Sequence, residues 1–302
     1  MNDSDLPIRI LQGDCRELLP QLPADSVHLI FTSPPYSDCR KDSYGGTPPD
    51  KYVEWFLPIG AELLRVLKPS GSFVLNIKEN VVNGERSTYV IDLIKALRQL
   101  GFFWVEEYVW FKKNCYPGKW PNRFRDAWER LLHFTKSRRF TMYQEAVMVP
   151  AAESTKNRAL SLSEGNWQRQ HPKTQSGLSR TYANCVGREM VYPHNVLHLA
   201  VECSNRKHSA AFPESLPEWF IRLFTVPGDV VLDPFAGSGT TGAVCRRLNR
   251  RFIGIEIVPE YVDIARERIF PPQHPLLFEN FPYESSKNDE VFSSTKHSAG
   301  GG

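Results

Sequence analysis

The sequence predicts an α/β domain built on a doubly wound, mostly parallel sheet that is interrupted by an inserted region. Short apolar runs alternate with amphipathic stretches before residue 139 and again after Pro213, which is the rhythm of strands and helices in a parallel sheet. Between 140 and 199 the rhythm disappears, and the chain becomes polar with isolated aromatics such as Trp167. A length of 302 residues accommodates one large domain with an insert.

The first part of the chain contains two predicted helices between predicted strands. A helix is expected over 52–67 and stops at the Lys-Pro-Ser-Gly run 68–71. A second helix is expected over 88–100 and stops at Gly101. The strands are short apolar runs, and they are predicted at 8–11, 27–31, 72–77, 102–111 and 131–135.

The same alternation resumes after Pro213. Strands are predicted at 230–233 and 252–256, and helices at 216–224, up to Arg247 and up to Ile269. Two parts of the chain are therefore expected to share one sheet, and the stretch between them to be a recognition region that has some fold of its own or becomes ordered on a ligand. The predicted boundaries are 1–139 and 201–272 for the shared domain, 140–200 for the recognition region, and 284–302 for a disordered polar tail.

The composition is that of an ordinary globular protein, with 41% hydrophobic and 24% charged residues. No stretch approaches the ~18 apolar residues of a membrane span, and the N-terminus lacks the order of a secretory signal, so a cytoplasmic location without membrane association is expected. The six cysteines form no CxxC pair. Reduced, mostly buried thiols are therefore predicted, with neither a disulfide framework nor a metal site.

Basic residues are concentrated in one stretch, 112–139, although the net charge of the chain is only +3. Four aromatic residues, Tyr116, Trp120, Phe124 and Trp128, are interleaved with them. Cations meet phosphates and aromatic faces stack on bases, so the stretch indicates a nucleic-acid surface, with a solvated basic face as the alternative. The basic residues are Lys112, Lys113, Lys119, Arg123, Arg125, Arg130, Lys136, Arg138 and Arg139, against the acids Asp126 and Glu129.

A glycine-rich turn with the sequence DPFAGSGTT, 233–241, follows an apolar strand and opens a helix. Glycines in this setting let the backbone turn tightly and approach a ligand. No GK[ST] follows and GxGxxG is not matched, so this is not a phosphate loop; a turn that merely needs glycine is the alternative. Glu256 ends the next strand at the carboxyl edge of the sheet, where its carboxylate can accept both hydroxyls of a ribose or else be a solvated cap.

The segment Thr32-Ser33-Pro34-Pro35-Tyr36 ends another apolar strand. The paired prolines fix φ and push the preceding residues into an extended conformation, so the loop can present Ser33 and backbone carbonyls at fixed positions. A stiff turn without chemistry is the alternative.

The two motifs together resemble those of the amino-methylating DNA methyltransferases of restriction–modification systems, in particular the cytosine-N4 group. The resemblance covers about residues 8–270. The catalytic motif comes first and the DPFAGSGT turn second, which is the beta-class order, and this order places a target-recognition region between them. The resemblance implies the fold of methyltransferases that use S-adenosyl-L-methionine, and double-stranded DNA as the partner. A restriction endonuclease is then implied as a genetic partner, and monomeric action suffices because one strand is modified at a time.

The resemblance also assigns residues. Ser33, Pro34, Pro35 and Tyr36 become the catalytic segment. Gly13-Asp14 resembles the segment near the adenine of the cofactor, and the HSAAFP run 208–213 resembles the segment that closes the methionine end. The predicted cofactor-binding residues are Asp14, Thr32, His208, Phe212, Asp233, Phe235, Gly237, Gly239, Thr240 and Glu256.

An exocyclic amine is a weak nucleophile, and in a duplex it is paired and stacked, so the base must leave the helix. Tyr36 is expected to stack on the flipped base, while the Ser33 hydroxyl and the Pro34 carbonyl accept hydrogen bonds from its amine. Cys39 is expected to be incidental, because no Pro-Cys of the ring-carbon enzymes is present. Serine before Pro-Pro-Tyr favours cytosine by resemblance; adenine-N6 methylation, an RNA or protein methyltransferase and an inactive DNA-binding homologue are the alternatives.

Overall fold

The computed structural model describes residues 7–38, 44–114, 122–153, 189–201 and 212–271, together with the backbone of 168–169 and 180–181. Residues 7–271 belong to one compact unit. His208, Cys39, Lys119 and the predicted tail 284–302 lie outside the described residues.

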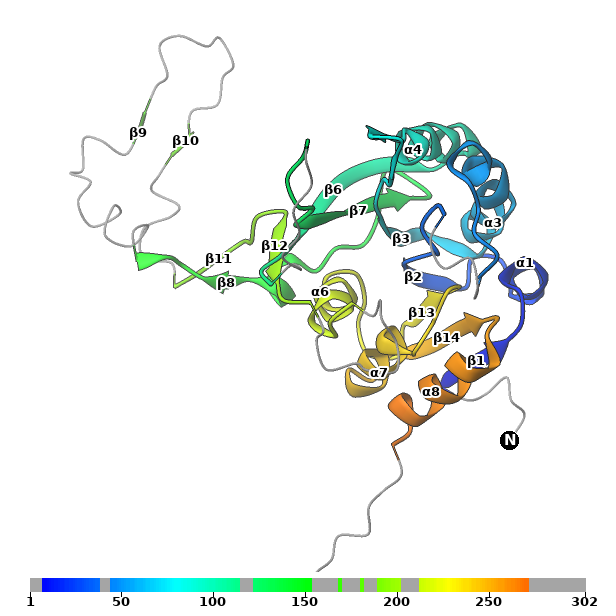
Figure 1. Cartoon of the computed structure of the whole chain (residues 1–302). Helices are drawn as coiled ribbons and strands as arrows, with labels where there is room; N and C mark the ends of the chain where they lie inside the picture. Colours follow the sequence, from blue (N-terminus) through cyan, green and yellow to red (C-terminus); the bar gives the residue numbers. More distant parts are fainter. Residues whose placement is uncertain are drawn as a thin grey trace, which may run out of the picture. The chain divides into compact units, whose positions relative to one another are not determined.

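An eight-stranded sheet forms the centre of this unit, in the order β1-β14-β13-β2-β3-β7-β6-β12 (Figure 1). Every neighbouring pair is parallel except the two pairs that contain β7. The mostly parallel, doubly wound fold predicted from the sequence is therefore confirmed. The strands are β1 (Ile8–Gln12), β2 (Val27–Thr32), β3 (Leu67–Ile77), β6 (Phe103–Lys112), β7 (Trp128–Thr135), β12 (Val196–Leu199), β13 (Val230–Asp233) and β14 (Arg251–Glu256).

Helices cover both faces of the sheet. The side chains of a buried strand alternate between the two faces, so each central strand presents apolar side chains that need covering on both faces. In β2, Ile30 belongs to the core beneath α1, α3 and α4, while Leu29 and Phe31 belong to the core beneath α6 and α7. The α-helices are α1 (Cys15–Leu18), α3 (Tyr52–Val66), α4 (Tyr89–Leu100), α6 (Ser215–Phe224), α7 (Thr240–Arg247) and α8 (Pro259–Ile269).

Short elements complete the description. Three 3₁₀ turns are η2 (Leu19–Gln21), η3 (Pro49–Lys51) and η4 (Gln144–Val147). Three small antiparallel ribbons pair β4 (Val81–Val82) with β5 (Glu85–Arg86), β8 (Val149–Pro150) with β11 (Met190–Val191), and β9 (Gln168–Arg169) with β10 (Arg180–Thr181).

The sheet reverses its winding between β2 and β13. The chain leaves β2 through α3 to reach β3 on one side, and leaves β13 through α7 to reach β14 on the other. Ligands of open α/β sheets bind outside the carboxyl ends of the strands at such a switch point. Because β2 ends in the Ser-Pro-Pro-Tyr segment and β13 ends in the glycine-rich turn, the fold brings both predicted motifs to this one place.

Two local expectations differ from the structure. The run 68–71 does not separate a helix from a strand, because β3 already begins at Leu67 and the run forms an irregularity in its pairing with β2, between Val27↔Leu67 and Leu29↔Ser72. The ends of the stretch predicted as an insert lie in the main domain. Val147 is buried in the core, and β12 is the edge strand next to β6.

The basic stretch 112–139 does not form one surface, which corrects the expectation from sequence. β7 runs antiparallel to β3, so Trp128 lies at the edge of the sheet where β2 and β3 end, and Thr135 lies at the opposite edge, across from Ser72. Lys136 therefore pairs with Asp25, which precedes β2, rather than facing the site. The strand reverses the direction of the chain and divides the charges between two edges.

Candidate active site

The two motifs are joined by a buried carboxylate at the switch point. Asp233, at the end of β13, accepts hydrogen bonds from the hydroxyls of Thr32 (2.6 Å) and Thr241 (2.9 Å), and from the backbone N–H of Phe235 (3.1 Å). Burial raises the pKa of Asp233 to about 6, although these hydrogen bonds favour its charged form. The side chains of Thr32 and Asp233, both predicted to bind a cofactor, thus contact each other and hold the two loops together.

The glycine-rich turn is shaped by contacts with α8 and β14. Gly239 has φ +77° and caps the N-terminus of α7, and a Cβ there would lie 2.8 Å from the Cβ of Ala265. The N–H of Gly237 donates to Glu256 Oε2 at 2.8 Å. Thr240 is buried, and its hydroxyl accepts a hydrogen bond from Arg268 at 2.5 Å. The glycines therefore serve close packing, and the Thr240 side chain is engaged with α8.

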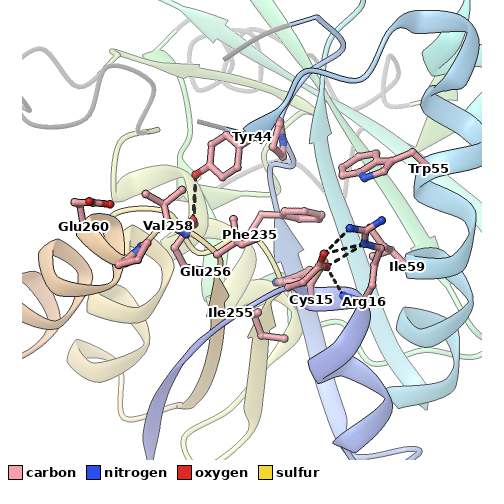
Figure 2. Close-up of a pocket in the computed structure, with 16 residues that line it drawn as sticks. Cys15, Arg16, Tyr44, Trp55, Ile59, Phe235, Ile255, Glu256, Val258 and Glu260 are labelled. Atoms are coloured by element: carbon pink, nitrogen blue, oxygen red, sulfur yellow. Dashed lines mark hydrogen bonds and ion pairs between the residues drawn. The ribbon is translucent and has the colours of Figure 1, made fainter. Parts of the chain in front are cut away.

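A cavity of about 530 Å³ opens at the carboxyl ends of β1, β13 and β14 (Figure 2). Its lining includes the predicted residues Asp14, Phe235 and Glu256, and also Pro35 from the Ser-Pro-Pro-Tyr loop. Pockets of this size bind ligands of a few hundred daltons. The cavity is therefore large enough for a nucleoside-sized cofactor, and it adjoins the catalytic loop.

Glu256 is the buried acid of this cavity, with 2% of its surface exposed. Its oxygens accept hydrogen bonds from the N–H groups of Gly237 (2.8 Å) and Val258 (2.9 Å), and the Tyr44 hydroxyl lies 3.3 and 3.4 Å from the two oxygens. Burial raises the pKa of Glu256, while these donors oppose the shift. A carboxylate has about four acceptor sites, and the N–H groups of Gly237 and Val258 fill two of them, so the acid can receive the two hydroxyls of a ribose once these replace the Tyr44 hydroxyl.

Asp14 lines the same cavity, but its carboxylate is already engaged. It caps α1 by accepting from the N–H of Arg16 at 2.8 Å, and it forms an ion pair with the Arg16 guanidinium. The hydrogen bonds and charge of Arg16 lower the pKa of Asp14. Asp14 and Arg16 together form a polar wall next to the backbone of Gly13.

Most of the remaining lining is apolar or aromatic, and Glu260 adds a further acid. The rings of Phe235 and Trp55 lie 5.9 Å apart, and Ile257 is 49% exposed at the rim. Figure 2 shows Phe235 between Trp55 and Glu256 in this view. A buried acid beside aromatic and aliphatic surfaces suits a ligand that joins a ribose to a flat heterocycle.

The Ser-Pro-Pro-Tyr loop, predicted from the sequence to be catalytic, follows β2 and is anchored on both sides. Pro34 is buried, and the Pro35 carbonyl accepts a hydrogen bond from the Tyr52 hydroxyl at 2.9 Å. The Ser33 hydroxyl donates to the Tyr36 hydroxyl at 3.4 Å. Tyr36 in turn donates to Glu129 at 2.7 Å, and burial together with the negative charge of Glu129 raises its pKa well above the usual value. Ser33 and Tyr36 are thus brought together with a carboxylate from β7.

Glu129 is a site residue that the sequence reasoning missed. It is 7% exposed, at the start of β7, and it also contacts Asn76 of β3 and Lys112 of β6. In the sequence it stands out only as an acid within a basic stretch, where it was counted as an offsetting charge. Its partner Tyr36 is 93 positions away, so no local pattern connects the two.

The segment that precedes β7 extends from the same edge of the sheet. Phe124 is 95% exposed, and its neighbours Arg123 and Arg125 are exposed too. The next acid, Asp126, is held by Lys78 (3.3 Å) and Arg86 (2.5 Å). An aromatic ring thus projects into solvent between two cations, in the segment that leads into β7.

Phe212 packs edge-to-face on Phe31 of β2, with ring centroids 5.4 Å apart. It therefore contacts the core beneath the catalytic strand. Within the described residues there is no cluster of acids, histidines and cysteines that could hold a metal ion, and no helix is both long and apolar enough to cross a membrane. Of the cysteines in the described ranges, Cys15 and Cys245 are free and buried.

Residues 27–267 match the family model described as DNA methylase. The chain belongs to this family of DNA methylases. This DNA methylase is also 34% identical to the type II methyltransferase M.PvuII of Proteus hauseri over 274 residues, a match that covers 83% of this chain and 80% of the relative. M.HinfI of Haemophilus influenzae is 30% identical, with 89% and 70% of the two chains covered.

Solved structures agree with this membership. The PvuII DNA methyltransferase, described as cytosine-N4-specific, superposes on this DNA methylase with a TM-score of 0.67 and 30% identity, covering 88% of each chain. TTHA0409 of Thermus thermophilus, described as a DNA modification methylase and solved with S-adenosyl-L-methionine, gives a TM-score of 0.57 at 26% identity, covering 86% of this chain and 92% of that one. The methyltransferase resemblance stated from the sequence is therefore confirmed.

Proposed function

We propose that this protein is a site-specific DNA methyltransferase that moves a methyl group from S-adenosyl-L-methionine to the exocyclic N4 amine of a cytosine flipped out of duplex DNA. One observation carries the proposal: the Thr32–Asp233 hydrogen bond joins the Ser-Pro-Pro-Tyr loop to the glycine-rich turn, beside a cavity that fits a nucleoside. The cytosine-N4 specificity of the similar PvuII enzyme, and the serine at position 33, support cytosine as the base.

The cofactor is S-adenosyl-L-methionine, and the residues of the cavity suit it. Glu256 would hold the ribose hydroxyls, and Phe235 and Ile257 would flank the adenine. Asp14 and Arg16 form the polar wall nearby. When bound, the cofactor supplies a methyl group on a positively charged sulfur, which is electrophilic without help from a metal.

The chain's own residues then act on the base. The Ser33 hydroxyl would accept a hydrogen bond from the target amine, which draws the nitrogen lone pair out of the ring and toward the methyl group. The Tyr36 ring would stack on the base and replace part of the stacking lost on flipping, a cost of a few kcal/mol. Tyr52 holds the Pro35 carbonyl, so the loop keeps its shape while the base enters.

Duplex DNA would lie across the edge that carries Arg123, Phe124 and Arg125. Arginines neutralise phosphates, and an exposed aromatic can wedge between base steps or stack on an unpaired base. Because methylation of its site protects DNA, a cognate restriction endonuclease follows as a genetic partner. The type II relatives support this assignment to a restriction–modification system.

The test is to express the chain in a host that lacks its own DNA methyltransferases, and to sequence the DNA by a method that distinguishes N4-methylcytosine from N6-methyladenine. N4-methylcytosine at one recurrent sequence is expected. Ser33→Ala should abolish it, whereas Ser137→Ala, at the opposite edge of the sheet, should not. Methyladenine instead of methylcytosine would refute the base assignment. Tritium transfer from the cofactor to RNA or protein, with none to DNA, would refute the substrate.

A further inference from the structure

Three side chains form a line of hydrogen bonds that leads from the catalytic loop into the sheet. The Ser33 hydroxyl donates to the Tyr36 hydroxyl at 3.4 Å, and the Tyr36 hydroxyl donates to Glu129 Oε2 at 2.7 Å. Both hydroxyls therefore donate in the direction that leads from the loop to Glu129. The line ends on a carboxylate, a group that becomes neutral rather than positively charged when it accepts a proton.

Glu129 is held by all the elements that surround it. Lys112 of β6 forms an ion pair with one oxygen, and Asn76 of β3 donates to the other at 3.1 Å. A buried carboxylate is costly unless it is paired and hydrogen-bonded, and these contacts supply the pairing. The ion pair and the amide satisfy the acid without Tyr36, so the contact with the catalytic loop is an addition to what the fold requires.

Burial and the negative charge of Glu129 favour a neutral tyrosine, although two lysines lie near that acid. Lys112 contacts Glu129 directly, and Lys78, paired with Asp126, acts on it from a greater distance. Burial and the Glu129 charge both raise the pKa of Tyr36, so its hydroxyl stays protonated at any pH at which the enzyme works. A neutral hydroxyl between a serine and a carboxylate can pass a proton along without becoming an ion itself.

Resting on the proposed function, we propose that Glu129 is the final proton acceptor of amine methylation, reached through Tyr36 and Ser33. The amine lone pair forms the N–C bond while the S–C bond breaks and its electrons stay on sulfur, which leaves a positive charge and a surplus proton on the amine. That proton moves to Ser33 Oγ, the Ser33 proton moves to the Tyr36 oxygen, and the Tyr36 proton moves to Glu129. One proton is transferred in sum, and nothing is oxidised.

Glu129 does not touch the base in this scheme, so it is a positioning and proton-accepting residue that acts through Tyr36. Ser33 alone could not keep a second proton, because a protonated hydroxyl is a very strong acid. After the transfer Glu129 is neutral, and it returns the proton to water when the product leaves. The sequence Ser-Pro-Pro-Tyr thus needs its tyrosine hydroxyl as well as its ring.

The decisive variant is Glu129→Gln, which keeps the shape of the side chain but cannot take the proton. We expect the single-turnover rate of methyl transfer to fall about 100-fold, the size of a typical general-base contribution. Dissociation constants for DNA and cofactor should stay within about twofold, as expected for an interaction that acts only on the chemical step. The pH profile of the rate in the variant should also differ from that of the wild type, because only in the wild type does the line end on a group that can take the proton. Glu107→Gln is the matched control, because Glu107 pairs with Arg130 on the same sheet without touching the loop.

Tyr36→Phe removes the hydroxyl that connects Ser33 to Glu129 but keeps the aromatic ring. This variant tests the proposed path of the proton if Glu129→Gln folds poorly. A similar loss of rate is expected, and the double variant should be no slower than either single one, because the residues act as one unit. A wild-type rate and pH profile in Glu129→Gln would overturn the proposal. The proposal would also be overturned if the losses of rate in the two single variants multiplied in the double variant, or if Glu129→Gln lost only affinity for DNA.

A measurement without DNA or cofactor separates this inference from the proposed function. With tyrosine labelled at Cζ, NMR follows the ionisation of Tyr36 in the free protein. Glu129→Gln should lower the pKa of Tyr36, because a neighbouring negative charge is lost. If this pKa shifts while the wild type methylates no DNA, the proposed function fails and the contact stands. An unchanged pKa would show that the hydrogen-bonded line does not exist in solution, and would overturn the inference alone.

Discussion

The hydroxyl of Thr32 donates a 2.6 Å hydrogen bond to the carboxylate of Asp233, across 201 positions of sequence. Thr32 ends β2 and Asp233 ends β13, the two strands at which the sheet reverses its winding. The contact places the loop proposed to hold the base next to the turn proposed to hold the cofactor. Transfer between two bound molecules depends on their alignment, so this buried pair links the fold directly to the chemistry.

Asp233→Asn should change how stability depends on pH. Burial raises the pKa of Asp233 from 3.8 to about 6, so the folded state binds this proton more tightly than the unfolded chain does. Its contribution to stability is therefore most favourable at low pH and is lost as pH rises toward about 6, after which a constant penalty remains. Between pH 5 and 7.5 the free energy of unfolding of the wild type should fall by about 1 to 2 kcal/mol relative to the variant, measured by urea denaturation.

If the difference in the free energy of unfolding between the wild type and Asp233→Asn is constant across this pH range, burial does not raise the pKa of Asp233. Ile91→Ala is the control, because Ile91 is exposed and carries no titratable group. Its difference in the free energy of unfolding from the wild type should not change with pH.

Glu256→Gln should weaken cofactor binding by about 10- to 100-fold, because hydrogen bonds to a charged acceptor contribute about 1.5 to 3 kcal/mol. Isothermal titration with S-adenosyl-L-methionine measures the change. Glu256 also accepts from Gly237 and Val258, so thermal melting should accompany the titration. Undiminished affinity in a folded variant would remove Glu256 from the cofactor site.

Gly239→Ala and Gly228→Ala form a matched pair. Both glycines have positive φ, +77° and +89°, so both substitutions strain the backbone, by about 1 kcal/mol. A Cβ at Gly239 would also lie 2.8 Å from that of Ala265, while nothing lies within 4 Å of one at Gly228. The Gly239 variant should therefore lose about 1 to 3 kcal/mol more, by overpacking. Equal melting temperatures would contradict the close approach of the turn and α8.

Phe124→Ala should weaken binding to duplex DNA by about tenfold, because stacking of a base on an aromatic ring contributes about 1 to 3 kcal/mol. Fluorescence anisotropy at two salt concentrations measures it. Phe124→Ala should leave the salt dependence of binding unaffected. Arg125→Gln should reduce the slope of the logarithm of the binding constant against the logarithm of the salt concentration by about one. Phe103→Ala, an exposed aromatic at the opposite edge of the sheet, is the control. Equal losses for the two phenylalanines would show that the edge beside the catalytic loop is not the DNA surface.

The sequence by itself determined the order of the elements and the identity of the two motifs. Apolar runs that end in Pro-Pro or in a glycine-rich turn report strand ends locally, because proline restricts φ and glycine permits it. Each strand and helix predicted on either side of residues 140–199 is present, although α1 and the β4–β5 ribbon were not predicted and β3 begins earlier, at Leu67. The acid at the end of β14 lies in the cavity where an acid was expected.

Only the tertiary structure decided which side chains meet. Asp233 and Thr32 were grouped with the cofactor, yet their side chains hydrogen-bond to each other. Glu129 looked like one charge among many, yet it contacts Tyr36 because β7 runs antiparallel and begins at the catalytic edge. A local pattern records whether a residue lies in a strand and which way its side chain alternates. The partner across the sheet depends on strand order and direction, which arise when distant segments pack into one core.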